Sequence, residues 1–220
     1  MDGKLIVFEG VEGGGKSTQM QRLIHWLQAK CFNIKGSVAT REPGGTELGK
    51  ALRSLLLEQS SDELVSDRTE LLMYAADRTQ HVETFIKPKL ERGTMVLCDR
   101  FTDSTIAYQG YGRGLDLDLI KQLNEIATGG LQSDLTFWLD INVEAGLTRV
   151  RARGKRDRME QANLEFHQRV QQGFSELARQ NPDRIVRINA DRPEDEVAHE
   201  IQTIFSAKLA TWGYFKSSES

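Results

Sequence analysis

A glycine-rich stretch near the start of the chain has the residue types and the spacing to hold phosphate. Residues 10–17 match G-x-x-x-x-G-K-[ST] at every position. In such a loop the backbone N–H groups surround phosphate oxygens, the following helix adds its positive end, and the ammonium of Lys16 reaches the outer phosphates. The alternative is a glycine-rich turn with a solvated lysine. An apolar run before the loop and helical spacing after it favour a nucleoside triphosphate site, with Ser17 offering a hydroxyl to Mg²⁺.

Charged residues follow two further apolar runs, at points where strands are expected to end. Residues 41–46 are typical of a turn and follow the run 34–40, and Asp99 with Arg100 follows 94–98. The carboxyl ends of parallel strands share the edge of the sheet where ligands bind. Asp99 can hold the water shell of Mg²⁺, and Arg100 can bind a phosphate through two hydrogen bonds. A surface salt bridge that caps the strand is the alternative, and the position after a buried strand favours function.

Two segments could recognise a flat, polar group. Tyr74 and Arg78 stand four residues apart in a helical pattern over 67–90, so they share a face and could stack on and hydrogen-bond one planar ligand. From this spacing alone, a core tyrosine beside a solvated arginine is the better interpretation. Residues 101–110 are rich in hydroxyl and amide groups, which could contact a base and a sugar or equally cap a helix.

A dense cationic cluster follows in the last third of the chain. Its members are Arg149, Arg151, Arg153, Lys155, Arg156 and Arg158. A charge run of this kind is usually a solvated surface. Because the chain also carries a phosphate loop, we favour a lid over about residues 151–160 that closes over phosphates, excludes water and adds positive charge.

The hydrophobic periodicity predicts how these segments are held together. Five apolar runs of strand length alternate with helical patterns, the first beginning at Leu5 and the others covering 34–40, 94–98, 135–141 and 184–190. This alternation predicts an α/β three-layer sandwich, in which a five-stranded parallel sheet is flanked by helices. We expect one domain over residues 1–211 and a polar, frayed tail over 212–220.

The composition narrows the class of protein. The 220 residues carry a formal net charge of −3, which argues against a general nucleic-acid-binding surface. Cys31 and Cys98 lie far apart and the four histidines form no metal-ligand pattern, so we expect reduced thiols in a cytoplasmic protein. The chain shows no charged leader with a cleavage site and no apolar run near about 18 residues, so we expect no contact with a membrane.

Several classes of phosphate-loop protein lose support. A GTPase would carry N-K-x-D to read its base and D-x-x-G after the metal-binding strand, and an ABC-type ATPase would carry L-S-G-G-Q. The chain contains none of these patterns. What remains is a small kinase, in which a phosphate-bearing or hydroxyl-bearing acceptor lies opposite the triphosphate.

Five stretches together resemble a known family. They are FEGVEGGGKST (8–18), TREPGG (40–45), LLMYAADR (71–78), DRFTDSTIAYQG (99–110) and DRME (157–160). They are similar to the bacterial type of the thymidylate kinase family, and the resemblance covers nearly the whole chain. It implies a P-loop nucleoside monophosphate kinase fold. It also implies transfer of the γ-phosphoryl group of ATP to the 5′-phosphate of dTMP, which gives dTDP and ADP.

The resemblance implies roles for individual residues. ATP would be bound by Gly10, Gly13, Gly14, Gly15, Lys16, Ser17 and Thr18, with Arg149 flanking adenine. The dTMP site would comprise Glu12, Arg41, Arg53, Tyr74, Arg78, Arg100, Ser104, Thr105, Tyr108 and Gln109. Ser17 and Asp99 would serve Mg²⁺, Asp99 through water. Lys16, Asp99, Arg100 and Arg153 would act in catalysis.

Within the dTMP set, each side chain has an implied partner. Arg41, Arg53 and Arg100 would clamp the phosphate. Glu12 would accept the sugar 3′-hydroxyl, and Tyr108 would crowd a ribose 2′-hydroxyl. Tyr74 would stack on thymine, and the base would also be recognised by Arg78, Ser104, Thr105 and Gln109. The family more often has phenylalanine at the stacking position, so the tyrosine hydroxyl needs a partner or water.

Two further features follow from the resemblance. Residues 11–14 contain no arginine, and in the family that absence accompanies an arginine supplied by the lid, for which Arg153 fits best. The resemblance also implies a homodimer formed through long helices, such as the one bearing Tyr74.

Two other functions remain as alternatives. A deoxynucleoside kinase, or another nucleoside monophosphate kinase, would share most of these residues; a hydroxyl acceptor would need a carboxylate base, which Asp99 could in principle provide. A phosphate acceptor is already anionic at neutral pH and needs no base. A nucleotide-binding regulator without turnover would keep the loop but lose the acceptor arginines, and Arg41, Arg53 and Arg100 are all present.

Overall fold

The core of the molecule is a sheet of five parallel strands. The structure is a computed structural model that describes residues 3–30, 34–58, 65–154 and 157–214. In these residues the strands are β1 (Leu5–Glu9), β2 (Ser37–Arg41), β3 (Met95–Asp99), β4 (Leu135–Asp140) and β5 (Ile185–Asn189). They pair in the order β2-β3-β1-β4-β5, and every pair is parallel. The parallel sheet predicted from the sequence is therefore confirmed.

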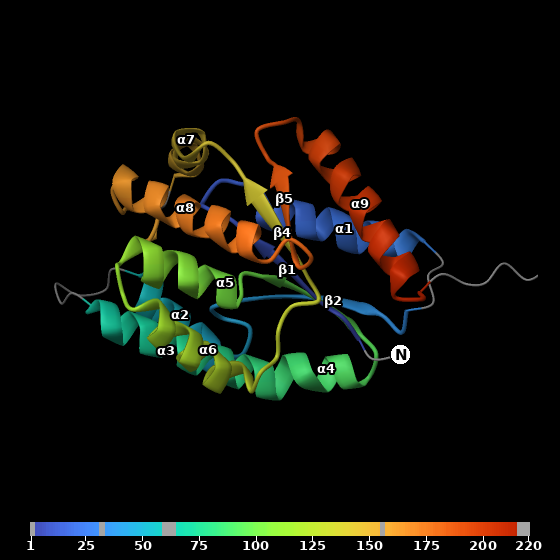
Figure 1. Ribbon diagram of the computed structural model, residues 1–220, viewed down its shortest axis with the longest axis horizontal. Helices are drawn as coiled ribbons and strands as arrows, with labels where there is room; N and C mark the ends of the chain where they lie inside the picture. The colour runs from blue at the N-terminus through green and yellow to red at the C-terminus, as the bar shows by residue number, and fades with distance from the viewer. Residues whose placement is uncertain (1–2, 31–33, 59–64, 155–156, 215–220) are drawn as a thin grey trace, which may run out of the picture.

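Helices cover both faces of this sheet. They are α1 (Lys16–Ala29), α2 (Glu47–Leu57), α3 (Asp67–His81), α4 (Lys87–Glu91), α5 (Thr102–Thr105), α6 (Leu117–Thr128), α7 (Val143–Arg153), α8 (Leu164–Gln180) and α9 (Glu194–Thr211). Figure 1 shows α3, α4 and α6 on one side of the sheet and α1, α8 and α9 on the other. The predicted three-layer sandwich is confirmed.

Alternate residues of the central strand β1 face two different hydrophobic cores. Leu5 and Val7 pack with apolar residues of the helical segment 82–86, whereas Ile6 and Phe8 pack with residues of α1, α8 and α9. All four β1 side chains are fully buried. Because both faces of the strand are covered, it has the continuous apolar sequence typical of a central parallel strand. The loop that follows β1 is thus anchored to the most buried part of the fold.

The strand register brings the predicted site residues to one edge. Phe8 of β1 lies opposite Asp99 of β3, and Arg41 of β2 lies opposite the same aspartate. Glu9 ends β1, so the phosphate loop leaves the sheet beside these residues. The carboxyl ends of three neighbouring strands therefore place the loop, Arg41 and Asp99 together, as the sequence predicts.

Two helical segments contain π-helical turns. The helix predicted over 67–90 consists of α3, a π-helical turn at Val82–Ile86 (η1) and α4. The polar segment predicted as a base reader or a helix start begins with α5 and continues as a second π-helical stretch, Ile106–Gly112 (η2). Such turns occur frequently at functional sites. The second one carries Tyr108 and Gln109.

The phosphate loop packs directly against α7. A Cβ atom at Gly13 would lie 2.2 Å from the carbonyl oxygen of Gly146, and one at Gly146 would lie 2.4 Å from the carbonyl oxygen of Glu12. Gly13 also has a φ of 77°, which favours glycine. These two glycines let the helix that leads into the predicted lid touch the loop.

Two predicted boundaries differ from the structure by more than one residue. β2 begins at Ser37 and not at residue 34, because Gly36 has a φ of 141° that is incompatible with a continuing strand. The predicted polar tail begins too early at 212, because Trp212 packs against the larger core and Tyr214 is buried in it.

Some expectations fall outside the described residues. Cys31, Lys155, Arg156 and residues 215–220 are among them. Within the described residues, none of the helices has both the length and the apolar composition needed to traverse a bilayer.

Candidate active site

A cavity of about 790 Å³ opens at the carboxyl edge of the sheet. Its lining includes every residue predicted for the site except Gly10 and Gly14. The predicted residues that line it are Glu12, Gly13, Gly15, Lys16, Ser17, Thr18, Arg41, Arg53, Tyr74, Arg78, Asp99, Arg100, Ser104, Thr105, Tyr108, Gln109, Arg149 and Arg153. Side chains that are far apart in the sequence therefore converge on one space.

Lys16 lies inside the loop that precedes it. Its Nζ donates hydrogen bonds to the carbonyl oxygens of Gly10 (3.1 Å) and Val11 (2.9 Å), and the residue is buried. Burial, and next the nearby charge of Arg100, lower the pKa of Lys16. Because α1 begins at Lys16, the positive end of the helix and the ammonium face the same space. An anion placed there would stabilise both.

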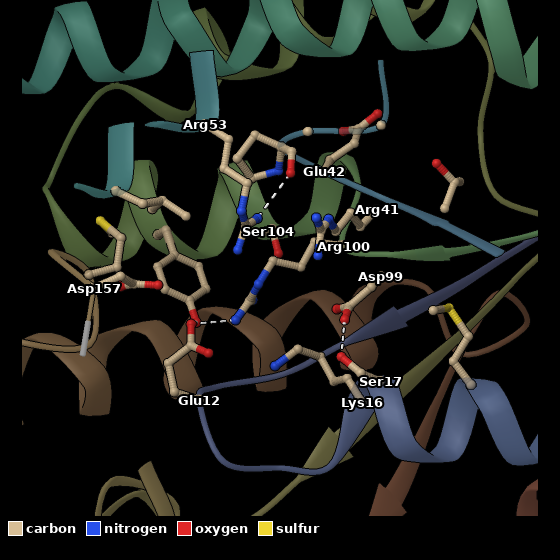
Figure 2. A pocket seen from close by; sticks show the side chains of 18 of the residues that line it. Glu12, Lys16, Ser17, Arg41, Glu42, Arg53, Asp99, Arg100, Ser104 and Asp157 are labelled. Atoms are coloured by element: carbon tan, nitrogen blue, oxygen red, sulfur yellow. Dashed lines mark hydrogen bonds and ion pairs between the residues drawn. The ribbon is translucent and has the colours of Figure 1, made fainter. Parts of the chain in front are cut away.

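Ser17 and Asp99 present hard oxygen atoms side by side. The Ser17 hydroxyl donates to Asp99 Oδ2 at 2.6 Å, as Figure 2 shows. Ser17 belongs to the first turn of α1 and Asp99 ends β3. Mg²⁺ prefers oxygen ligands and commonly binds one or two protein groups together with substrate phosphates. The hydroxyl and the carboxylate therefore fit a Mg²⁺ that is shared with a nucleotide.

Arg100 connects the two sides of the cavity. Its guanidinium donates to the carbonyl oxygen of Gly10 at 3.0 Å and to Ser104 Oγ at 3.2 Å. It also forms an ion pair with Glu12 and lies 4.8 Å from the ring centre of Tyr108. The backbone of Arg100 has a φ of 68°, a left-handed conformation that residues with a side chain rarely adopt. Strain of this kind persists where several contacts enforce it, and it concentrates at functional sites.

Glu12 is held in its ionised form. Burial alone would raise its pKa, but the charges of Arg100 and then Lys16 outweigh burial and lower the pKa to about 2. Arg100 and the Tyr108 hydroxyl, which donates at 3.0 Å, both bind Oε1. No described residue donates to Oε2. This second oxygen could accept a hydrogen bond from a ligand hydroxyl.

Arg41 and Arg53 form a cationic pair that makes no ion pair with a carboxylate in the part of the chain that the structure describes. Within that part, the guanidinium of Arg53 donates a hydrogen bond to the carbonyl oxygen of Pro43, at 3.0 Å. Burial, and next the positive charge of Arg41, lower the pKa of Arg53. Figure 2 places both arginines with Arg100 above Lys16. Like charges gathered in this way fit an anionic ligand.

Arg78 is a buried structural residue that keeps one edge toward the cavity. It is 2% exposed, so the interpretation of a solvated arginine is wrong. Its Nε donates to Glu42 at 2.8 Å, and its other nitrogens donate to Thr105 Oγ1, to Asn124 and to the carbonyl oxygen of Phe101. These bonds leave a second N–H on Nη2 for a ligand.

Tyr74 lies beside Arg78 and lines the same cavity. Burial, and next the charge of Glu70, raise the pKa of Tyr74 above its ordinary value. The phenol therefore stays neutral, and its ring presents an uncharged surface next to the arginine edge.

Glu9 supports the segment that carries Arg100 and Ser104. It is fully buried and accepts hydrogen bonds from the backbone N–H groups of Phe101 (2.8 Å) and Ser104 (3.1 Å) and from the Ser104 hydroxyl. Burial, and next the charge of Asp103, raise the pKa of Glu9 to about 7. The Ser104 hydroxyl, predicted to contact a base, thus has a carboxylate partner.

The predicted lid lies against the cavity. Arg149 donates to the carbonyl oxygen of Gly13 at 3.4 Å, and Arg153 forms an ion pair with Glu160 while remaining largely exposed. The backbone N–H of Arg158 donates to the carbonyl oxygen of Leu57 at the end of α2, at 3.0 Å. The end of α7 and the lid together therefore reach from the phosphate loop to the opposite wall.

Sequence reasoning missed four buried carboxylates around the site, namely Glu9, Glu42, Glu70 and Glu160. Glu42, Glu70 and Glu160 form ion pairs with arginines, and Glu9 holds the segment of Phe101 and Ser104. Glu42 could have been found, because it directly follows Arg41 within the TREPGG stretch. Glu70 stands in an ordinary helical pattern, and its partners come from distant segments, so the sequence contains no local signal for it.

Comparisons with known proteins identify the family of the chain. The family model described as Thymidylate kinase matches residues 8–201. The chain is similar to the thymidylate kinase of Trichodesmium erythraeum (strain IMS101), with 61% identity over 97% of this chain and 100% of that protein. It is also similar to the thymidylate kinase of Nostoc punctiforme, with 59% identity over 95% of this chain and 98% of that one. A crystal structure of thymidylate kinase from Ehrlichia chaffeensis superposes with a TM-score of 0.75 at 35% identity, over 93% of this chain and 99% of that chain.

The raised pKa of Glu9 predicts a pH-dependent stability. The folded state retains the Glu9 proton up to about pH 7, whereas the unfolded chain releases it near pH 4.5, so the free energy of unfolding falls as pH rises between these values. Glu9→Gln stays neutral: its amide oxygen can still accept from the backbone N–H groups of Phe101 and Ser104, and its amide nitrogen can donate to the Ser104 hydroxyl. From pH 5 to pH 8 we expect the variant to gain about 2 to 3 kcal/mol relative to the native chain in urea unfolding. Glu91→Gln, at an exposed residue, is the control. If the free energies of unfolding of Glu9→Gln and the native chain differed equally at pH 5 and pH 8, the raised pKa of Glu9 would be contradicted.

Proposed function

The chain belongs to the thymidylate kinase family, and from this premise we propose that it transfers the γ-phosphoryl group of ATP to the 5′-phosphate of dTMP in the cytoplasm, giving dTDP and ADP. One observation carries the proposal. A phosphate loop faces Arg41 and Arg53 across one cavity, and neither arginine forms an ion pair with another described residue. This arrangement suits two phosphate-bearing ligands placed end to end.

The donor side would hold ATP through the loop. We propose that the loop amides of Gly10 to Gly15, with Lys16, Ser17 and Thr18, bind its phosphates. The Lys16 ammonium already bonds two loop carbonyls and would turn toward the phosphates. Arg149, which reaches the loop at Gly13, would flank adenine.

A Mg²⁺ ion would be held by Ser17 directly and by Asp99 through water. This assignment is supported by the 2.6 Å contact between their oxygen atoms. When bound, the ion would neutralise charge on the phosphates. Because Asp99 already accepts a hydrogen bond from Ser17, it is a poor candidate for the base that a hydroxyl acceptor would need.

The acceptor side would hold dTMP by its phosphate and sugar. Arg41, Arg53 and Arg100 would clamp the phosphate, and Glu12 would accept the 3′-hydroxyl through the oxygen that no described residue contacts. Tyr108 donates to the same carboxylate and would crowd a 2′-hydroxyl.

The base would lie between Tyr74 and the polar groups beyond it. Tyr74 would stack on thymine, and Arg78 would use its remaining N–H on a carbonyl edge. Thr105 and Ser104 would act mainly by supporting this edge, because Thr105 accepts from Arg78 and Ser104 donates to Glu9. Gln109 would complete the recognition of the base.

The reaction would need neutralised charge and correct alignment, with no proton-abstracting side chain. The acceptor phosphate has a second pKa of about 6 and is already a nucleophilic anion near neutral pH. Positive groups surrounding the transferred phosphoryl group supply most of the catalysis in such reactions. We propose that Lys16 and Arg100 act from the floor of the cavity and that Arg153 acts from the lid.

Removing Arg153 should slow the chemical step. We expect Arg153→Ala to lower kcat by about a hundredfold or more, because a single arginine that stabilises the transferred group is worth about 10³ to 10⁵ in rate. The KM for dTMP should change less than threefold in steady-state assays. The control is Arg151→Ala, an exposed arginine on the same helix. A kcat near that of the native chain would exclude Arg153 from this role.

The substrate proposal is tested with a panel of acceptors. In a coupled assay of ADP release, dTMP should be phosphorylated far faster than thymidine, AMP, GMP or dCMP. Preference for thymidine would make the protein a nucleoside kinase. ATP hydrolysis without any acceptor preference would reject the kinase assignment.

We also propose a homodimer formed through the layer of α2, α3 and α6. These helices expose large apolar side chains, namely Leu48, Leu55, Leu72, Leu119 and Ile126, and α3 packs against both of the other helices. Exposed apolar groups gathered on one layer are typical of association surfaces.

A charge placed on this layer should break the dimer. We expect the native chain to have the mass of a dimer by light scattering, and Leu72→Glu to shift it to a monomer that keeps its far-UV circular dichroism. Thr203→Glu, on α9 in the other helical layer, should remain dimeric. A monomeric native chain would contradict the proposal.

A further inference from the structure

One buried carboxylate joins the base pocket to the lid. Glu70 lies in the first turn of α3 and has no exposed surface. Its Oε1 accepts a hydrogen bond from Gln109 Nε2 at 2.7 Å, and its Oε2 forms an ion pair with Arg158 of the lid. Arg113 contacts both oxygens, at 3.4 Å and 3.1 Å. Glu70 does not line the cavity, whereas Gln109 does.

The first contact fixes the orientation of the Gln109 amide. Gln109 is 2% exposed, and its Nε2 must face Glu70 because a carboxylate can only accept hydrogen bonds. No described residue bonds the Gln109 Oε1. The amide therefore offers the cavity a carbonyl acceptor together with the second N–H of Nε2.

The second contact fixes the lid. Arg158 donates from its backbone N–H to the carbonyl oxygen of Leu57 at 3.0 Å and from its Nε to that of Leu56 at 2.8 Å. Its Nη2 forms the ion pair with Glu70. A lid residue thus bonds the end of α2 and the same carboxylate that orients the amide.

The fixed amide has a definite complement. A pyrimidine-2,4-dione presents an N–H donor at position 3 between two carbonyl acceptors, which matches an amide that offers one acceptor and one donor. A 4-aminopyrimidine presents the opposite pattern, an acceptor at position 3 beside an amino donor. For such a base to bind with its ring in the same place, the Gln109 amide would have to rotate and turn its oxygen toward Glu70, leaving two acceptors facing each other without a hydrogen.

We propose that Glu70 is a positioning residue that selects a pyrimidine-2,4-dione through Gln109 and couples this choice to lid docking through Arg158. The inference rests on the proposed dTMP kinase function, because it assigns the base to the pocket that Gln109 lines. A base that rotates the amide disturbs Glu70, and with it the lid contact, so a wrong base is rejected both in binding and in turnover. Sites that depend on buried hydrogen-bonding groups reject mismatched ligands strongly.

The direct test is Glu70→Gln, with Glu83→Gln as the matched control. Glu83 undergoes the same change at an exposed ion pair with Lys87, on the helical turn that follows α3. We expect Glu70→Gln to lower the ratio of kcat/KM for dTMP to that for dCMP by about tenfold or more, while the KM for ATP changes less than threefold. An unchanged ratio in a folded variant would overturn the inference.

A double-mutant cycle tests the coupling without relying on that variant. Gln109 and Arg158 do not contact each other among the described hydrogen bonds, and both bind Glu70. We expect the effects of Gln109→Met and Arg158→Gln on kcat/KM for dTMP to be non-additive by about threefold or more. Additive effects would overturn the inference, even if Glu70→Gln failed to fold.

The two proposals fail in different ways. If the native chain does not phosphorylate dTMP, the proposed function fails. If it phosphorylates dTMP and discriminates against dCMP, but Glu70→Gln keeps that discrimination and the cycle is additive, the function stands and the role of Glu70 is wrong. In a chain that already carries Glu70→Gln, the effects of Gln109→Met and Arg158→Gln on kcat/KM for dTMP should become additive.

Discussion

The contacts of Arg100 determine how the two halves of the cavity face each other. Its backbone N–H bonds the carbonyl oxygen of Phe8 at the end of β1, and its guanidinium bonds that of Gly10 in the phosphate loop. The same guanidinium pairs with Glu12 and lies over Tyr108. These contacts enforce a left-handed backbone at Arg100. The fold therefore positions the residues of the proposed donor and acceptor sites relative to each other, which is what in-line transfer between two phosphates requires.

Some arginines around the cavity pair with carboxylates and others do not, and this difference explains how a chain with a negative net charge forms a cationic site. The formal net charge is −3, yet positive groups converge on the cavity. Buried carboxylates such as Glu42 and Glu70 pair with the arginines that shape the walls. Arg41 and Arg53 lack such a partner among the described residues and lie where the acceptor phosphate is proposed to bind. The protein thus stabilises its structural cations internally, and the arginines left over are those proposed to bind ligand phosphates.

Much of this arrangement was predictable, because part of it depends on local patterns. Residues 10–17 specify their own loop and helix start, and alternating apolar runs specify a parallel sheet whose carboxyl edge gathers Arg41 and Asp99. The partners of Arg78 were not predictable, because they lie on other elements and are brought together only by folding. The same holds for Glu70, whose partners follow it by 39 to 88 residues. The π-helical turns also lacked a local signal, since their spacing differs little from that of an α-helix.

The central claim is that dTMP and ATP meet end to end within surrounding positive charge, and a crystal structure with dTMP, ADP and Mg²⁺ bound tests it most directly. The account predicts that the dTMP phosphate contacts Arg41, Arg53 and Arg100, and that the ADP phosphates lie in the loop around Lys16. Thymine should lie against Tyr74, with the amide of Gln109 at its position 3. A dTMP molecule bound away from Arg41 and Arg100, or with its base at the mouth of the cavity, would contradict the account.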